Sequence, residues 1–145
     1  MKTILFILLL IASNITFACK ERAELNEYPV EELSSENILI EAKITHIEKI
    51  KEGRYSTIKS FDAEVITSFQ GSLKPGEVIN VIPSEEEAHA VCPVYVETNS
   101  GYLLVLKKSE NTYRISRFSY RANKESPYFE KFKEQIRSNL SSKNT

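Results

Sequence analysis

The sequence predicts a mainly β fold in which five strands form a small barrel and one α-helix follows at the C-terminal end. Five segments carry strand signals, and clusters of Gly, Pro and Ser separate them. The last part of the chain instead places apolar residues at intervals of three and four, the period of an amphipathic helix. A β-sandwich would need about seven strands. The pattern therefore favours a partly open, five-stranded Greek-key barrel of the OB type.

The first two predicted strands alternate between apolar and polar residues, as half-buried strands do. They cover residues 38–45 and 55–69, with Gly53 in the turn between them. The apolar positions are Ile38, Ile40, Ala42 and Ile44 in the first strand and Phe61, Ala63 and Val65 in the second. Two breaks follow, at Gln70-Gly71-Ser72 and at Lys74-Pro75-Gly76.

Three shorter strands complete the predicted barrel. The third runs from Val78 to Ile82 and is stopped by Pro83. After an acidic loop at residues 84–91, Tyr102 to Leu106 has the continuous apolar character of a fully buried strand. Thr112 to Phe118 is the fifth strand, and its predicted inward residues are Tyr113 and Ile115.

The helix is predicted over about residues 126–140. Ser126 supplies a side-chain cap, and Pro127 has a preset backbone angle that suits the first helical position. The apolar stripe consists of Phe129, Phe132, Ile136 and Leu140. A helix with one such stripe is expected to pack against the strands.

Residues 1–18 have the features of a cleaved secretory signal peptide. Lys2 supplies a positive charge, residues 4–12 are uninterruptedly apolar, and Thr16 and Ala18 place small residues before the cut. The apolar run is shorter than the roughly 20 residues of a membrane-spanning helix, so no transmembrane segment is predicted. We expect a secreted or periplasmic, in any case extracytoplasmic, protein in which residues 19–145 form one domain.

Cleavage after Ala18 makes Cys19 the first residue of the mature chain. A lipid anchor on its thiol is the less favoured alternative, because Thr16 and Phe17 stand where lipid-attachment signals usually carry Leu and a small residue. The chain has two cysteines, and an exported chain with two cysteines is expected to form one disulfide. Cys19 and Cys92 would then close a long loop, with a stabilisation of about 4 kcal/mol in the chain-entropy model.

The charge and the histidines argue against several classes of function. The formal net charge is −1, and loss of Lys2 makes the mature chain only one charge more negative, so nucleic acid is not an expected partner. His89 lies three residues before Cys92, but a disulfide-bonded Cys is neither a nucleophile nor a metal ligand. His46 stands alone on a strand. With no catalytic or phosphate-binding motif, we expect a protein that is not an enzyme and needs no cofactor.

Five features, taken in order, carry a resemblance to a known family. They are Ala18-Cys19 at the cleavage site, residues 38–43 as first strand, Phe69-Gln70-Gly71, Ala90-Val91-Cys92, and residues 101–105. This order resembles the tissue inhibitors of metalloproteinases and the wider netrin-like domains, which are OB-fold barrels, in a bacterial-type single-domain version. The chain departs from that pattern at Glu21 and at residues 117–119, where those inhibitors usually have further cysteines. Two of the family's disulfides are therefore missing.

The resemblance implies a mechanism of inhibition. In those inhibitors the first Cys binds the protease zinc through its main-chain amine and carbonyl, which would here be the main-chain N and O of Cys19. A catalytic zinc keeps an open position, and an α-amino group is partly neutral at physiological pH. The disulfide would hold this terminus beside the loop before Cys92. The protease-binding ridge would consist of Cys19, Lys20, Glu21 and Arg22 together with Ala88, His89, Ala90 and Val91.

Lys20 leaves a second function open. In the inhibitors the side chain after the first Cys enters the main specificity pocket of the protease, and a lysine there would bury a charge unless the pocket offered an acid. The alternative is a netrin-like extracytoplasmic module that binds an unknown protein without inhibiting it. The disulfide would then only tie down the N-terminus.

Overall fold

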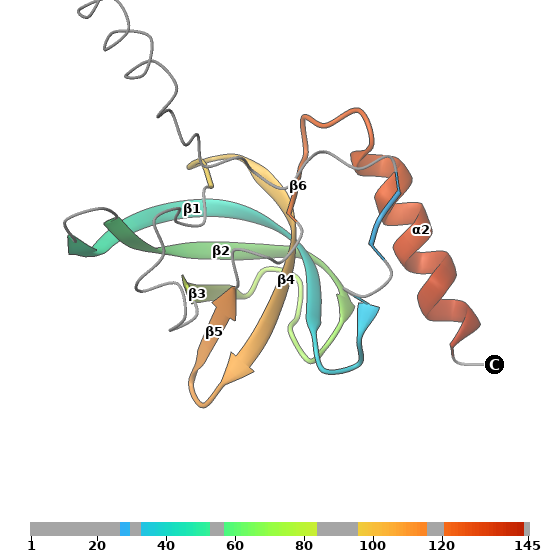
Figure 1. Ribbon diagram of the computed structural model, residues 1–145, viewed down its shortest axis with the longest axis horizontal. Helices are drawn as coiled ribbons and strands as arrows, with labels where there is room; N and C mark the ends of the chain where they lie inside the picture. Colours follow the sequence, from blue (N-terminus) through green and yellow to red (C-terminus); the bar gives the residue numbers. More distant parts are fainter. Residues whose placement is uncertain (1–26, 30–32, 53–56, 84–95, 116–120, 144–145) are drawn as a thin grey trace, which may run out of the picture.

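The computed structural model describes residues 27–29, 33–52, 57–83, 96–115 and 121–143. Six strands and one helix lie in these ranges (Figure 1). The strands are β1 (Ile38–Glu52), β2 (Thr57–Gln70), β3 (Val78–Pro83), β4 (Gly101–Ser109), β5 (Thr112–Ile115) and β6 (Ala122–Asn123). The helix is α2 (Phe129–Ser142), and it lies beside the barrel (Figure 1).

Five of the strands form a closed ring. The order is β1-β2-β3-β5-β4, and β4 pairs in turn with β1. All pairs are antiparallel except β3 and β5, which run parallel. The predicted fold class, a mainly β five-stranded barrel of OB type with a C-terminal helix, is confirmed. The barrel is closed where a partly open one was predicted, because β1 pairs with β4 from Ile38 to Lys43.

The interior of the barrel is filled by the residues that the strand period predicts. Both apolar sets predicted for the first two strands are buried there, and Ile115 and the partly buried Tyr113 of β5 join them. β1 and β2 curve around this core because their pairing is interrupted by β-bulges, one of which lies between Glu41 and Ala42. A bulge bends a strand and increases its twist, which allows two long strands to wrap a small barrel.

The predicted break after β2 is confirmed by the backbone of one glycine. Gly71 has a φ of 112°, a conformation that favours glycine. A Cβ built there would lie 3.1 Å from the side chain of Ile38. Both the backbone angle and the close approach therefore exclude a larger residue at this turn.

Several strand limits differ from the prediction. β1 continues to Glu52, seven residues beyond the predicted end, and β4 extends on both sides of residues 102–106. The predicted turn at Gly53 and the end of the fifth strand at residues 116–118 lie outside the described residues. The sequence analysis missed β6, because two residues are too few to show a period. Its pairing with Tyr102 and Leu103 adds a short edge strand to β4.

The predicted helix start at Ser126 is wrong, since α2 begins at Phe129 and ends at Ser142. The Ser126 hydroxyl accepts a hydrogen bond from the Tyr128 N–H at 3.2 Å, and its carbonyl accepts one from the Phe129 N–H at 3.1 Å. Ser126 and Pro127 thus form a separate turn before the helix, as serine hydroxyls often do when they bond the backbone two residues on.

The predicted stripe of α2 does pack against the strands. Phe129, Phe132 and Ile136 are buried, and Leu140 is partly buried beside them. They form a second core on the outside of the barrel, and the other buried members of this outer core are Tyr28, Leu33, Leu39, Leu103, Val105 and Ala122. The wall formed by β1 and β4 is therefore buried on both of its faces.

Candidate functional site

The residues of the predicted protease-binding ridge lie outside the part of the chain that the structure describes. These are Cys19, Lys20, Glu21, Arg22, Ala88, His89, Ala90 and Val91, together with Cys92 and the signal peptide at residues 1–18. The ridge and the Cys19–Cys92 disulfide stay predictions. The structure does describe the segments to which both halves of the ridge are attached.

The first of these is the lead-in segment, residues 27–29 and 33–37, which precedes β1. Leu33 and Tyr28 are buried in the outer core. The Tyr28 ring meets the Phe132 ring edge-on, with 5.8 Å between the ring centres. The lead-in segment is thus packed against α2 by apolar contacts, although it has little regular structure of its own.

Hydrogen bonds hold the same segment at both ends. On the helix side, the Tyr28 N–H donates to Gln135 Oε1 at 3.0 Å, and Lys143 Nζ donates to the Leu33 carbonyl at 2.9 Å. On the barrel side, Gln70 Nε2 donates to the carbonyls of Ser34 at 2.6 Å and Asn37 at 2.7 Å. Side chains from β2 and α2 therefore replace the backbone partners that a strand or helix would supply.

The second described segment next to the ridge residues is the pre-β4 segment, residues 96–100. It follows residues 88–91 in the sequence. Val96 is buried in the barrel core. The Asn99 N–H donates to the Ile44 carbonyl at 2.7 Å, and the Ile44 N–H donates to the Ser100 carbonyl at 2.9 Å. The Glu97 N–H donates to the Tyr102 hydroxyl at 3.1 Å. The chain is therefore fixed to β1 and β4 within residues 96–100, a segment that begins five positions after Val91.

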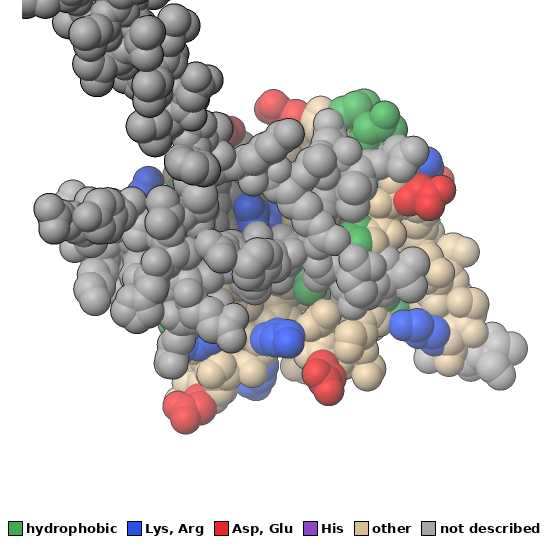
Figure 2. All heavy atoms as spheres, viewed as in Figure 1, with side chains coloured by type: hydrophobic (Ala, Val, Ile, Leu, Met, Phe, Trp, Pro, Cys, Tyr) green, Lys and Arg blue, Asp and Glu red, His purple; other side chains and the backbone are tan. Residues whose placement is uncertain are grey.

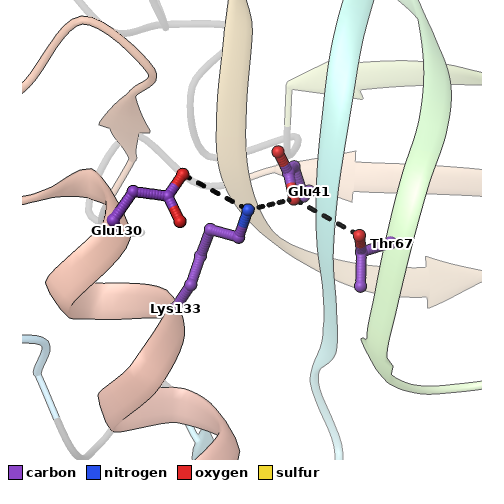
Figure 3. A network of polar contacts seen from close by, with 4 residues as sticks. All are labelled: Glu41, Thr67, Glu130 and Lys133. Carbon is purple, nitrogen blue, oxygen red and sulfur yellow. Dashed lines mark hydrogen bonds and ion pairs between the residues drawn. The ribbon is translucent and has the colours of Figure 1, made fainter.

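A polar network joins α2 to the outer face of the barrel wall, beside the outer core (Figure 3). Lys133 Nζ lies 3.0 Å from Glu41 Oε2, and the two side chains are 13% and 10% exposed. The Thr67 hydroxyl donates to the same carboxylate oxygen at 3.3 Å. Lys133 also contacts the exposed Glu130 at 3.4 Å. The Glu41 carboxylate is therefore matched by a cation and a hydroxyl, which suits a structural contact.

Sequence reasoning missed this network. Glu41 lies at a polar position of an alternating strand, and that pattern predicts a side chain facing solvent. The covering helix is 92 residues further along the chain at Lys133, so no local signal connects the two. Two features of the sequence do indicate that this face is covered, namely the apolar Leu39 beside Glu41 and the continuous apolar run at residues 102–106.

The described ranges contain neither a cluster of potential metal ligands nor a helix suited to span a membrane. No group of three or more His, Cys, Asp or Glu residues there is arranged to hold a metal ion. His46 is exposed on β1, opposite Asp62 of β2 in the strand register. Within the same ranges, no helix combines the length and the apolar character needed to cross a membrane.

Charge is distributed without a dominant sign on the face shown in Figure 2. Acidic and basic side chains of the described residues are interspersed there (Figure 2).

Neither the protein-family models nor the curated proteins with which the chain was compared match it. The case for a function therefore depends on the residues of this chain and on its fold.

Proposed function

We propose that the protein is exported and acts as a non-enzymatic inhibitor of a zinc protease, with the main-chain amine and carbonyl of Cys19 as ligands of the protease zinc. The observation that carries this proposal is that an OB-type barrel anchors both segments from which the ridge residues extend. Residues 19–22 precede the lead-in segment in the sequence, and residues 88–91 precede the pre-β4 segment. An inhibitor needs such fixed attachment points, because ordering a free chain on binding lowers affinity.

The chain lengths permit the two halves of the ridge to meet. Cys19 is eight residues before Glu27, and Cys92 is four residues before Val96. At the extended limit of about 3.6 Å per residue, these stretches span about 29 Å and about 14 Å. A compact domain of about 100 residues has a radius of gyration of only about 13 Å. The Cys19–Cys92 disulfide is therefore within reach from the two anchored segments.

The chemistry of the mature N-terminus suits a catalytic zinc. Such a zinc has three protein ligands and an open fourth position that is filled by water. An α-amino group with a pKa of about 7.7–8.0 is partly neutral at physiological pH and can displace this water. The adjacent carbonyl oxygen provides a second ligand, and the zinc can expand to five-coordination. Displacement of the nucleophilic water stops the protease without any reaction on the inhibitor.

Lys20 restricts the class of target. If the side chain after Cys19 enters the specificity pocket, a buried ammonium group needs an acidic partner there. The proposed target is therefore a zinc protease with an acidic or solvent-open pocket. Lys20→Thr should extend inhibition to proteases with apolar pockets.

The decisive experiment compares the mature protein beginning at Cys19 with a form that carries one extra alanine before Cys19. Both are assayed against a panel of zinc proteases, with a serine protease as a control that has no metal. The extension turns the amine into an amide nitrogen with almost no ligand strength, so inhibition should fall by orders of magnitude. The melting temperature should barely change, because the barrel and α2 are untouched.

Two results would overturn the proposal. If the mature protein inhibits no protease of the panel, the inhibitor function is wrong, and a netrin-like protein-binding module takes its place. If the extended form inhibits as well as the natural one, the zinc-ligand mechanism is wrong although the inhibition is real. N-terminal sequencing and mass measurement of the exported protein give a separate check, since a lipid on Cys19 or another cleavage site also excludes the mechanism.

A further inference from the structure

The helix α2 makes contacts that its own stability does not require. Phe129, Phe132 and Ile136 already attach it to the barrel through buried apolar surface. Gln135 and Lys143 in addition bond backbone atoms of the lead-in segment, over separations of 107 and 110 residues. Their partners are a main-chain N–H and a main-chain carbonyl. These two contacts therefore fix the path of the backbone and do not depend on the side chains of the lead-in segment.

The contacts are distributed so that each end of the lead-in segment has its own support. Gln70 of β2 bonds the carbonyls of Ser34 and Asn37, next to the start of β1. Gln135 bonds Tyr28, six residues nearer to the N-terminus than Ser34. The barrel thus bonds only the end of the segment that joins β1, whereas the helix side bonds Leu33 near that end and also Tyr28, at the end that leads toward Cys19.

We propose that α2 serves as a clamp for the N-terminal part of the mature chain, with Gln135 and Lys143 as its positioning residues. The clamp sets the direction in which the chain leaves the domain toward Cys19. The consequence for zinc-protease inhibition rests on the function proposed above. The clamp itself is a property of the described residues and can be tested without a protease.

The test uses the full mature protein and three single variants. Gln135→Met removes the acceptor of the Tyr28 N–H and keeps the length of the side chain. Gln135→Glu keeps an acceptor oxygen at the same place and should rescue the contact. Glu134→Met is the matched control, because Glu134 is exposed and adjacent on α2, so that the same kind of polar group is lost away from the lead-in segment.

The first readout is amide hydrogen exchange measured by NMR. In Gln135→Met the Tyr28 amide should exchange about 2- to 12-fold faster than in the natural protein, which corresponds to loss of one hydrogen bond of about 0.5–1.5 kcal/mol. Exchange of the β1 and β4 amides should be unchanged, as should all rates in Gln135→Glu and Glu134→Met. Unchanged exchange of Tyr28 in Gln135→Met, or equal acceleration in Glu134→Met, would overturn the clamp.

A second variant keeps the test independent of Gln135. Lys143→Met removes the donor to the Leu33 carbonyl, so the carbonyl ¹³C signal of Leu33 should shift, and Lys143→Arg should restore it. If the Leu33 signal does not respond to Lys143→Met, the lysine is not part of the clamp and the proposal fails for that residue.

The last readout connects the clamp to inhibition. For a protease that the natural protein inhibits, Gln135→Met should weaken inhibition several-fold while Gln135→Glu and Glu134→Met do not. Normal inhibition by Gln135→Met, despite faster exchange at Tyr28, would show that the clamp does not position Cys19 and would overturn that part of the proposal. If the natural protein inhibits nothing, the function proposed above is wrong, whereas the exchange measurement still decides the clamp.

Discussion

The interior of the barrel and the outer core beneath α2 are both formed by buried apolar residues, but they are assembled in different ways. The barrel interior is mostly aliphatic and comes from the strands, from Leu73 between β2 and β3 and from Val96 before β4. The outer core is rich in aromatic rings, and it combines the lead-in segment, two strands of the wall, β6 and the helix. It also borders the Glu41–Lys133 ion pair. The first core is organised by strand pairing, and the second depends on side chains that meet across nearly the whole chain.

The two cores share one wall, so their stabilities are expected to be coupled. Neighbouring residues of β1 face opposite cores, since Leu39 lies in the outer core and Ile40 in the barrel. Leu103 and Leu104 divide in the same way on β4. A change in either core therefore acts on strands that the other core also needs.

The largest expected effect comes from removing a buried ring from each core. Phe61→Ala in the barrel and Phe132→Ala on α2 should each lower the free energy of unfolding by about 3–5 kcal/mol, through lost burial and a cavity. Denaturant titration measures the free energy of unfolding of each variant. Hydrogen exchange should show that Phe132→Ala loosens α2 and the lead-in segment before the barrel strands. Equal loss of protection in all strands would show the two cores to be one cooperative unit.

The effect of the predicted Cys19–Cys92 disulfide comes next in size. Cys92→Ser should lower the free energy of unfolding by about 2–5 kcal/mol, the usual effect of losing a native bridge from a small exported domain. Thiol titration of the native protein is the direct check. Two reactive thiols in the native protein would contradict the disulfide, and Cys92→Ser should then be nearly neutral.

The ion pair beside the outer core should give a smaller, non-additive effect. Among the described residues, Lys133→Met leaves the Glu41 carboxylate with only the Thr67 hydroxyl, and Glu41→Leu leaves the Lys133 ammonium group with only the exposed Glu130 as an ion-pair partner. Each should cost about 1–3 kcal/mol. The free energy of unfolding of the double variant should be higher than that of the less stable single variant, because the double variant lacks both charges of the pair. If the two single effects simply add in this double-mutant cycle, the interaction between Glu41 and Lys133 does not contribute to the free energy of unfolding.

The smallest effect is expected on the outer surface of β2. Ile66 is 46% exposed, and it is an apolar side chain at a bulge of the β1–β2 pairing. Ile66→Thr keeps a β-branched residue in the strand and should change the free energy of unfolding by less than about 0.5 kcal/mol. A loss above about 1 kcal/mol in thermal unfolding would show that this surface is covered in the folded protein.

The difference between the two cores also explains which features the sequence could predict. Alternation along β1 and β2 identified Ile40, Phe61 and their neighbours as barrel interior, because a period of two is a local property. The stripe of α2 was found in the same way. The closing contact between β1 and β4 has no local signal, since it joins residues more than fifty positions apart.

The start of the helix shows a limit of a different kind. Ser126 and Pro127 are favourable at a helix N-terminus, but both are also common in turns. In this protein they form a turn before the helix. The contacts of Gln135 and Lys143 could not be predicted at all, because their partners are backbone atoms and leave no pattern in the sequence. The ridge predicted from Cys19 to Arg22 and from Ala88 to Val91 stays a prediction.

The long-range attachment of the lead-in segment has a consequence for the order of folding. A ribosome releases the N-terminal part of the chain first, yet Tyr28 and Leu33 find their partners 107 and 110 residues later. Until α2 has been made, Leu39 and the other outward apolar residues of the wall stay uncovered. Domains dominated by such distant contacts fold in milliseconds to seconds. We therefore expect the growing chain to remain incompletely folded until the last turns of α2 have been synthesised. Until then, its exposed apolar residues need protection from aggregation.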